Sequence, residues 1–177
     1  ISISPTLKAG KLPFDSDRDF TFITNIWSLP NFLVGNLALQ AGTIPELIDL
    51  LKRNPGKYSY ASAGLGTTLH IAGELFKLYA GVDMVHVPYR GAAPALSDVI
   101  AGHVDGFFGD IPGLIGFVRS GQLRPIGIAA AKRHPLLPEV RTFEEMGIKG
   151  MDSDNWYALF TTRGTPAADI ERINKAV

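Results

Sequence analysis

Residues 59–70 read SYASAGLGTTLH, and this stretch decides how the chain is expected to fold. The segment 58–63 is rich in β-forming and small residues, which favours a buried strand. Gly64 and Gly66 permit a tight turn, because glycine adopts backbone conformations that a side chain forbids. A helix is expected next, with Thr67 or its neighbour as N-cap and apolar residues recurring on one face. The stretch therefore predicts a strand, a glycine turn and a helix start.

The start of this helix is a candidate anion site. The first N–H groups of a helix have no intrahelical acceptor, and together they carry roughly half a positive charge. Small hydroxyl-bearing residues around them complete a cradle for a carboxylate or a phosphate. A plain strand–turn–helix connection without a ligand explains the same residues, so both interpretations stand at this point.

Strand and helix patterns alternate regularly after this stretch. The first helix is expected to end at Gly81, and strands are expected at 84–89, 104–108 and 123–129, with helices at 94–101 and 111–119 between them. Such alternation implies an α/β fold with a parallel sheet, right-handed crossovers and helices on both faces. Ligands of such sheets bind beyond the carboxyl ends of the strands. Three glycine-containing loops are expected at that edge: 63–68, 89–92 and 109–110.

The flanking segments carry local signals of their own. A capping box at 43–46 predicts a helix that ends at 54–56, and another at 142–145 predicts a short helix ending at Gly147. Segment 130–140 has no periodicity and is expected to be a linker. Extended segments are expected at 1–4, 20–26, 27–34 with a break at Pro30, and 154–160, followed by a last helix with Thr165 as N-cap.

Composition excludes several classes of function. Lysine plus arginine and aspartate plus glutamate both number 17, so no net field attracts nucleic acid or an acidic membrane. A hydrophobic content of 46% over 177 residues indicates one globular domain or one and a half. The absence of cysteine excludes disulfides and cysteine metal sites. A start at Ile1 and a helical pattern running to Val177 suggest an excised fragment.

Common catalytic and cofactor motifs do not match. Thr67 stands where the P-loop requires lysine, and Leu69 stands where the dinucleotide fingerprint requires its third glycine. No two of the four histidines have the spacing of a zinc site. There is no Gly-x-Ser-x-Gly elbow, and Ser62 lacks the local context of a nucleophile.

Three further residues have two interpretations each. His86 shares a strand face with apolar neighbours and is interpreted as structural. His70 lies in the first helical turn, where it is either a neutral donor at the sheet edge or a packing residue. Asp110 is either the N-cap of the following helix or a ligand contact.

Several motifs together resemble a known family. They are YASAGLGTTLHIAGELF at 60–76, VHVPYRG at 85–91, PA at 94–95, GHVD at 102–105, AKR at 131–133, WYALF at 156–160 and GTPA at 164–167. In order and over nearly the whole chain, they are similar to the signature of the Bug/TctC substrate-binding proteins of tripartite tricarboxylate transporters.

The resemblance implies a periplasmic binding protein of type II, with two domains and a hinge. Segment 1–36 would be part of the first domain, 37–150 the second α/β domain, and 151–177 a return to the first. Such a receptor captures a small carboxylate (a di- or tricarboxylate, an amino acid or an aromatic acid) in the interdomain cleft. The implied partners are this ligand and the membrane transporter subunits, with no nucleic acid, cofactor or metal. The receptor is expected to be a monomer, and it is not expected to be an enzyme.

The resemblance also implies a set of ligand-binding residues. They are Ser62, Ala63, Gly64, Gly66, Thr67, Thr68, His70 and Asp110. The family's secretion signal, its Pro-Gly-Gly-type loop and its C-terminal strand and helices have no counterpart in these residues. Two alternatives remain: an α/β enzyme acting on a small carboxylate or phosphate ester at the carboxyl ends of the strands, and an interaction domain that reuses the fold.

Overall fold

The computed structural model describes residues 11–151 and 153–177, which form two compact units. The large unit comprises Leu29–Asn155, and the small unit contains the described residues before and after it. The strand expected at 1–4 lies outside the described residues. The division into domains at 36/37 and 150/151 stays a prediction, and the two units are described separately.

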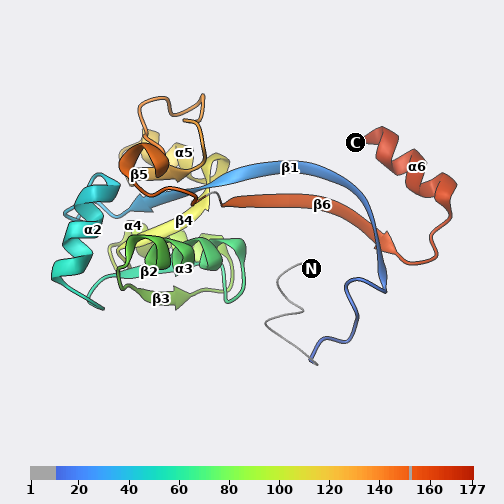
Figure 1. Cartoon of the computed structure of the whole chain (residues 1–177), viewed down its shortest axis with the longest axis horizontal. Helices are drawn as coiled ribbons and strands as arrows, with labels where there is room; N and C mark the ends of the chain where they lie inside the picture. The colour runs from blue at the N-terminus through green and yellow to red at the C-terminus, as the bar shows by residue number, and fades with distance from the viewer. Residues whose placement is uncertain (1–10, 152) are drawn as a thin grey trace. The chain divides into compact units, whose positions relative to one another are not determined.

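The large unit is built on a mixed sheet, with strand order β3-β2-β4-β1-β5 (Figure 1). The strands are β1 (Phe20–Gly35), β2 (Ser59–Ser62), β3 (Val85–Pro88), β4 (Gly106–Asp110) and β5 (Arg124–Ala129). Strand β2 is parallel to both β3 and β4, as expected. Strand β1, however, lies antiparallel between β4 and β5, so the expectation of an entirely parallel sheet is wrong.

The end of β1 explains this arrangement. All of Asn31–Gly35 are buried, and a strand with both faces buried belongs in the middle of a sheet. The predicted break at Pro30 does not occur, because β1 continues through this residue. The pairings of β1 with β4 and β5 begin at Asn31, so the missing N–H of Pro30 costs neither ladder a hydrogen bond.

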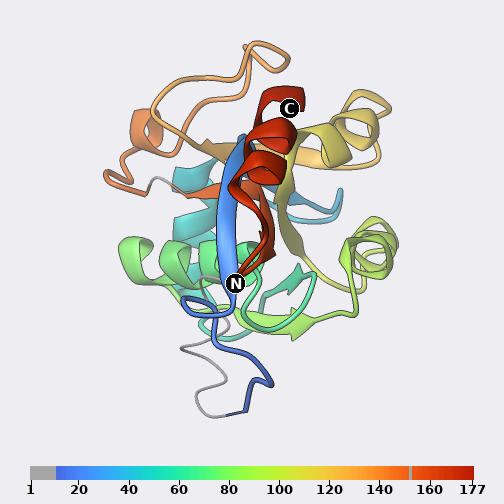
Figure 2. The same ribbon diagram turned by 90° about the vertical axis from the view of Figure 1, so that its right-hand side faces the viewer.

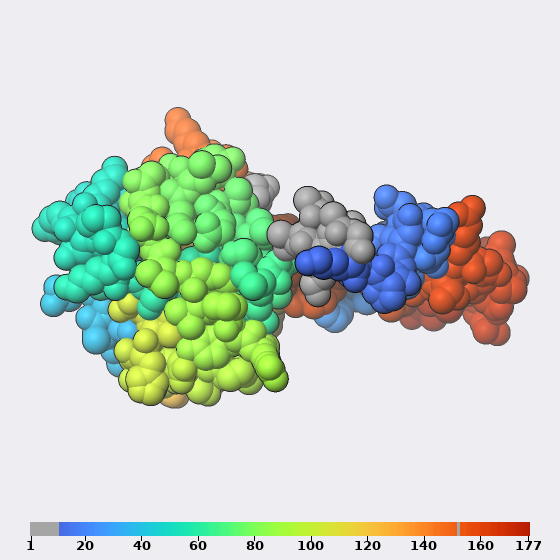
Figure 3. Space-filling view, turned by 90° about the horizontal axis from the view of Figure 1, so that it is seen from below, coloured from blue at the N-terminus to red at the C-terminus, as the bar shows by residue number. Residues whose placement is uncertain are grey.

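Helices cover both faces of this sheet (Figure 2). Helix α3 (Thr68–Ala80) covers one face, where Phe76 contacts Phe108 of β4. Helices α4 (Ala92–Ile100) and α5 (Ile111–Arg119) pack against the opposite face. Figure 3 looks onto the β3 edge, where α3, β3 and α4 make up the green to yellow-green surface.

Local signals placed most helix ends correctly. Helix α2 (Ile44–Arg53) has Thr43 as its N-cap, whose side chain accepts from Glu46 N, and the helix ends at Asn54. Helix α6 (Ala167–Ala176) is the exception, because its N-cap is Pro166 rather than the predicted Thr165. The Thr165 hydroxyl instead hydrogen-bonds the Thr161 hydroxyl and the Thr162 carbonyl, and no side chain caps the start of α6 in the described part of the chain.

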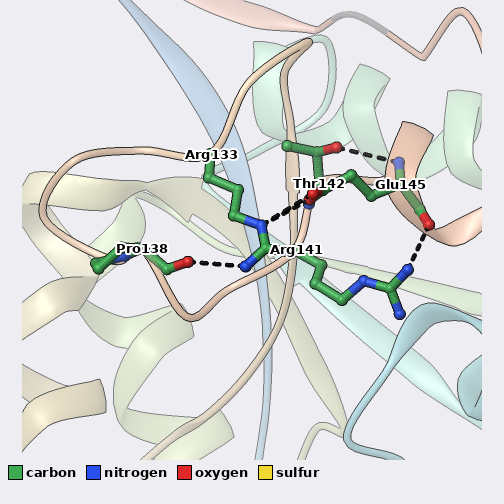
Figure 4. A network of polar contacts seen from close by, with 5 residues as sticks. All are labelled: Arg133, Pro138, Arg141, Thr142 and Glu145. Carbon is green, nitrogen blue, oxygen red and sulfur yellow. Dashed lines mark hydrogen bonds and ion pairs between the residues drawn. The ribbon is translucent and has the colours of Figure 1, made fainter.

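The expected linker after β5 is held by a polar network (Figure 4). Arg133 Nε donates to both carboxylate oxygens of Glu145 at 2.9 Å, and its Nη1 donates to the Pro138 carbonyl. Arg141 donates to the Glu145 carbonyl. Thr142 and Glu145 form the predicted capping box of the 3₁₀ helix η1 (Glu144–Met146). After this loop the chain pairs with β5 again, through an isolated β-bridge between Thr142 and Ile128.

The small unit is formed by the outer part of β1, most of β6 (Asp154–Thr162) and α6. Phe22 contacts Phe160 edge-on, Trp27 lies 5.4 Å from Tyr157 between ring centroids, and Asn174 of α6 donates to the Ile23 carbonyl. Across residues 11–151 and 153–177, no helix has both the length and the apolarity that a membrane span requires.

Candidate functional site

The glycine turn after β2 has the predicted geometry. Gly64 has φ +135° and Gly66 has φ +75°, conformations that favour glycine. Thr67 is the N-cap of α3: its Oγ1 accepts from His70 N at 3.3 Å and donates to the Gly64 carbonyl at 2.8 Å. The Ala63 carbonyl accepts from Gly91 N, which joins the turn to the loop after β3. These hydrogen bonds therefore fix the conformation of the turn.

Two N–H groups at the start of α3 remain without a partner. The amides of Thr68 and Leu69 donate to no acceptor among the residues that the structure describes. The first turn of α3 has no acidic side chain, and the helix is 13 residues long. From Ala63 to Thr68 the turn is half-buried or exposed, whereas Ser62 beneath it is fully buried. This end of α3 can therefore receive an anion.

A stack of three rings supports the turn from below. His70 Nδ1 accepts from Gly66 N at 3.1 Å, which requires a neutral imidazole protonated at Nε2. The His86 ring stacks on His70, with centroids 4.2 Å apart, and on its other side stacks on Tyr60 at 4.9 Å. His86 Nε2 lies 2.7 Å from Ser62 Oγ. The interpretation of His86 as a structural residue fits this position, but no sequence pattern indicated its contact with Ser62.

Electrostatics favour the neutral forms of His86 and Tyr60. Burial lowers the pKa of the His86 imidazole. Burial also raises the pKa of the Tyr60 phenol, whose hydroxyl donates to Glu74 Oε1 at 2.6 Å. Burial alone would raise the pKa of Glu74, but the hydrogen bonds from Tyr60 and Lys77 lower it on balance.

Stability is therefore expected to fall in mild acid. Because the folded pKa of His86 lies below its ordinary value of 6.5, the unfolded chain binds more protons between these two pH values. The contribution of His86 to the free energy of unfolding should be constant above about pH 7 and should decrease as the pH falls below 6.5. Denaturant unfolding from pH 8 to pH 5 measures this slope. His86→Phe should reduce the slope, whereas His103→Gln, at an exposed imidazole, should not; equal slopes in the two variants would contradict the assignment.

Asp110 joins the same end of α3 through a residue that the sequence did not single out. Asp110 occupies the N-cap position of α5, but its side chain makes no capping hydrogen bond. Its carboxylate instead accepts from Asn155 Nδ2 at 3.1 and 2.9 Å, and Asn155 Oδ1 accepts from Thr68 Oγ1 at 2.7 Å. Asp110 is thus the N-cap of α5 by position, as predicted, but its carboxylate contacts Asn155 instead of capping the helix. Asn155 lies 45 residues away in the sequence, so no local pattern could have linked it to Asp110.

All the expected site residues therefore lie in one region of the large unit. The turn from Ser62 to Thr68 and His70 forms one part, and Asp110 is connected to it by Asn155. The sequence analysis missed Asn155, and it did not foresee the contact of His86 with Ser62. Asn155 directly precedes the WYALF motif, and this position is the one signal that could have drawn attention to it.

Comparison with known proteins finds a family whose model matches this chain. The family model described as "Tripartite tricarboxylate transporter family receptor" (TctC) matches residues 3–177. A protein of Pseudomonas sp. strain P51, from the tcbD–tcbE intergenic region, is 38% identical over 168 residues, which are 94% of this chain and 50% of that protein. Protein BugT of Bordetella pertussis is 29% identical over 94% of this chain and 51% of its own length. The chain thus spans about half the length of these relatives.

Solved structures share the fold. A structure described as a periplasmic transporter has a TM-score of 0.93 at 34% identity, over 98% of this chain and 58% of that one. Rpa4515 of R. palustris, solved with adipate, has a TM-score of 0.88 at 32% identity, over 92% and 54%. MatC of Rhodopseudomonas palustris, solved with malate, has a TM-score of 0.88 at 28% identity, over 98% and 59%.

Proposed function

Because the chain belongs to the tripartite tricarboxylate transporter receptor family, we propose that it is part of a periplasmic solute-binding receptor for a small carboxylate. The receptor would act as a monomer and deliver its ligand to the membrane subunits of a tripartite transporter. The proposed ligand residues are the turn and its neighbours: Ser62, Ala63, Gly64, Gly66, Thr67, Thr68, His70 and Asp110.

The observation that carries this proposal is the pair of amides at Thr68 and Leu69, which have no acceptor in the described part of the chain. These donors, with the positive end of α3, can bind a carboxylate without a buried cationic side chain. Gly64 and Gly66 let the backbone approach the ligand closely, and Thr67 fixes the orientation of the turn. Adipate and malate, bound in two solved relatives, belong to the proposed ligand class.

A second candidate function is an α/β enzyme that uses Ser62 and His86. Ser62 Oγ lies 2.7 Å from His86 Nε2, a distance that suits a nucleophile and its base. Ser62 is fully buried, however, and its Oγ also lies within hydrogen-bonding distance of Gly64 N and of the Gly64 carbonyl. An attacking hydroxyl must reach its substrate, so this contact fits support of the turn better than catalysis. Turnover of any carboxylate or ester that disappears in Ser62→Ala would favour the enzyme.

Binding is tested by thermal unfolding of the full-length protein with a panel of mono-, di- and tricarboxylates. At least one acid should raise the melting temperature. Thr67→Val should raise the Kd of this acid about tenfold, because the variant loses the side chain that orients the N–H donors at the start of α3. Thr43→Val is the matched control, since Thr43 caps α2 in the same way as Thr67 caps α3.

Each N-cap variant should cost about 1 kcal/mol of stability, whereas only Thr67→Val should change binding. A panel without any thermal shift, or equal affinities in the two variants, would contradict the proposed function.

A further inference from the structure

A buried amide lies at the end of the sheet nearest the proposed site. Asn31 of β1 is fully buried, and its Nδ2 donates to the carbonyl and to the Oγ of Ser153, both at 3.0 Å. A carbonyl oxygen only accepts, so this contact fixes which end of the amide faces Ser153. Asn31 Oδ1 then has no donor among the residues that the structure describes. Buried acceptors without a partner are rare and call for an explanation.

The position of Asn31 links it to the proposed site. Asn31 is directly opposite Asp110 in the antiparallel pairing of β1 and β4. Side chains of directly opposed residues project from the same face of a sheet and lie next to each other. The Asp110 carboxylate is connected through Asn155 to Thr68, the first residue of α3. Asn31 and Asp110 thus place acceptor oxygens on the face of the sheet that α3 covers, near its N-terminal end.

The two parts of this region have opposite hydrogen-bonding character. The start of α3 presents N–H donors, which suit a carboxylate. Asn31 Oδ1 and the Asp110 carboxylate only accept, so they suit a hydroxyl or an ammonium group. A ligand that carries only carboxylates would pair with the N–H donors at the start of α3. It would offer no donor to Asn31 Oδ1, which would stay buried and unpaired. Sites built to bind a donor discriminate strongly against analogues that lack it.

We propose that Asn31 and Asp110 form an acceptor subsite that selects small carboxylic acids bearing a hydroxyl or ammonium group. The proposal rests on the proposed function, because it requires the carboxylate to occupy the start of α3. Asn31 is a specificity-determining residue in this arrangement. Asp110 adds a negative charge, which favours an ammonium group and disfavours an additional carboxylate.

Matched ligands test the subsite by calorimetry on the full-length protein. Succinate, malate and aspartate share one carbon chain, and malate or aspartate should bind about tenfold or more tightly than succinate. Asn31→Ala should abolish this preference while leaving the Kd for succinate within about twofold. Asn36→Ala is the control, because Asn36 is another buried asparagine, whose Nδ2 donates to the Val104 carbonyl and whose Oδ1 accepts from Leu39 N. It should leave the preference unchanged.

Asp110→Asn provides a second variant that keeps the size of the side chain, in case Asn31→Ala does not fold. It should weaken aspartate binding more than malate binding and tighten succinate binding, because it removes the negative charge that disfavours an additional carboxylate. Succinate bound as tightly as malate and aspartate would overturn the subsite while leaving carboxylate binding intact. Failure of every carboxylate in the wider panel would overturn both proposals.

Discussion

Gly73→Ala is expected to destabilise the large unit by about 2 kcal/mol, although alanine normally stabilises a helix relative to glycine by about 1 kcal/mol. Gly73 is a buried residue of α3, and a Cβ at this position would overlap Cε2 and Cζ of the Tyr60 ring. That ring cannot move aside easily. It is fully buried, stacks on His86, and its hydroxyl donates to Glu74.

Gly116→Ala in α5 is the matched control for this substitution. A Cβ at Gly116 meets no atom within 4 Å, so only the helix propensity changes there. This variant should gain about 0.5–1 kcal/mol of stability, so the two variants should shift the melting temperature in opposite directions, by about 2–4 °C per kcal/mol. Stabilisation by Gly73→Ala would show that the Tyr60 ring stack is not rigid.

The same ring stack shows where prediction from the sequence ends. Thr67 and Gly81 were identified correctly as the ends of a helix, because caps are encoded within a few residues of each other. The contact between Ser62 and His86 joins residues 24 positions apart on neighbouring strands. It depends on the register of two strands, which no local pattern specifies.

The candidate site was only partly predictable for the same reason. The glycine turn is local, and its residues were identified together. Asn31 and Asp110 meet only because β1 is inserted antiparallel beside β4, an arrangement that strand–helix alternation does not indicate. Asn155, which is 45 residues from Asp110 in the sequence, connects the Asp110 carboxylate to Thr68 of α3. The glycine turn and Asp110 were thus predictable from the sequence, whereas Asn31 and its position opposite Asp110 required the sheet order.

Backbone geometry at the turn gives the second large expected effect: Gly64→Ala should weaken carboxylate binding about tenfold or more, by the 1–3 kcal/mol that such backbone strain costs. At φ +135° an L-residue is strained, and a Cβ would lie 3.3 Å from the Tyr89 carbonyl. The turn would have to change its conformation to accept alanine. Such a change would break the bonds that Thr67 and Ser62 make to Gly64, and with them the orientation of the amides that follow.

Gly81→Ala separates this effect from backbone strain in general. Gly81 also has positive φ, at +61°, but it lies at the C-terminal end of α3, where a Cβ meets nothing within 4 Å. It should cost about 1 kcal/mol of stability, because the left-handed conformation is unfavourable for alanine, and leave the Kd unchanged. Titration calorimetry with the tightest acid of the panel, at equal ionic strength for all variants, measures both constants. Wild-type affinity in a folded Gly64→Ala protein would mean that the ligand does not contact this turn, and the carboxylate site would have to lie elsewhere on the chain.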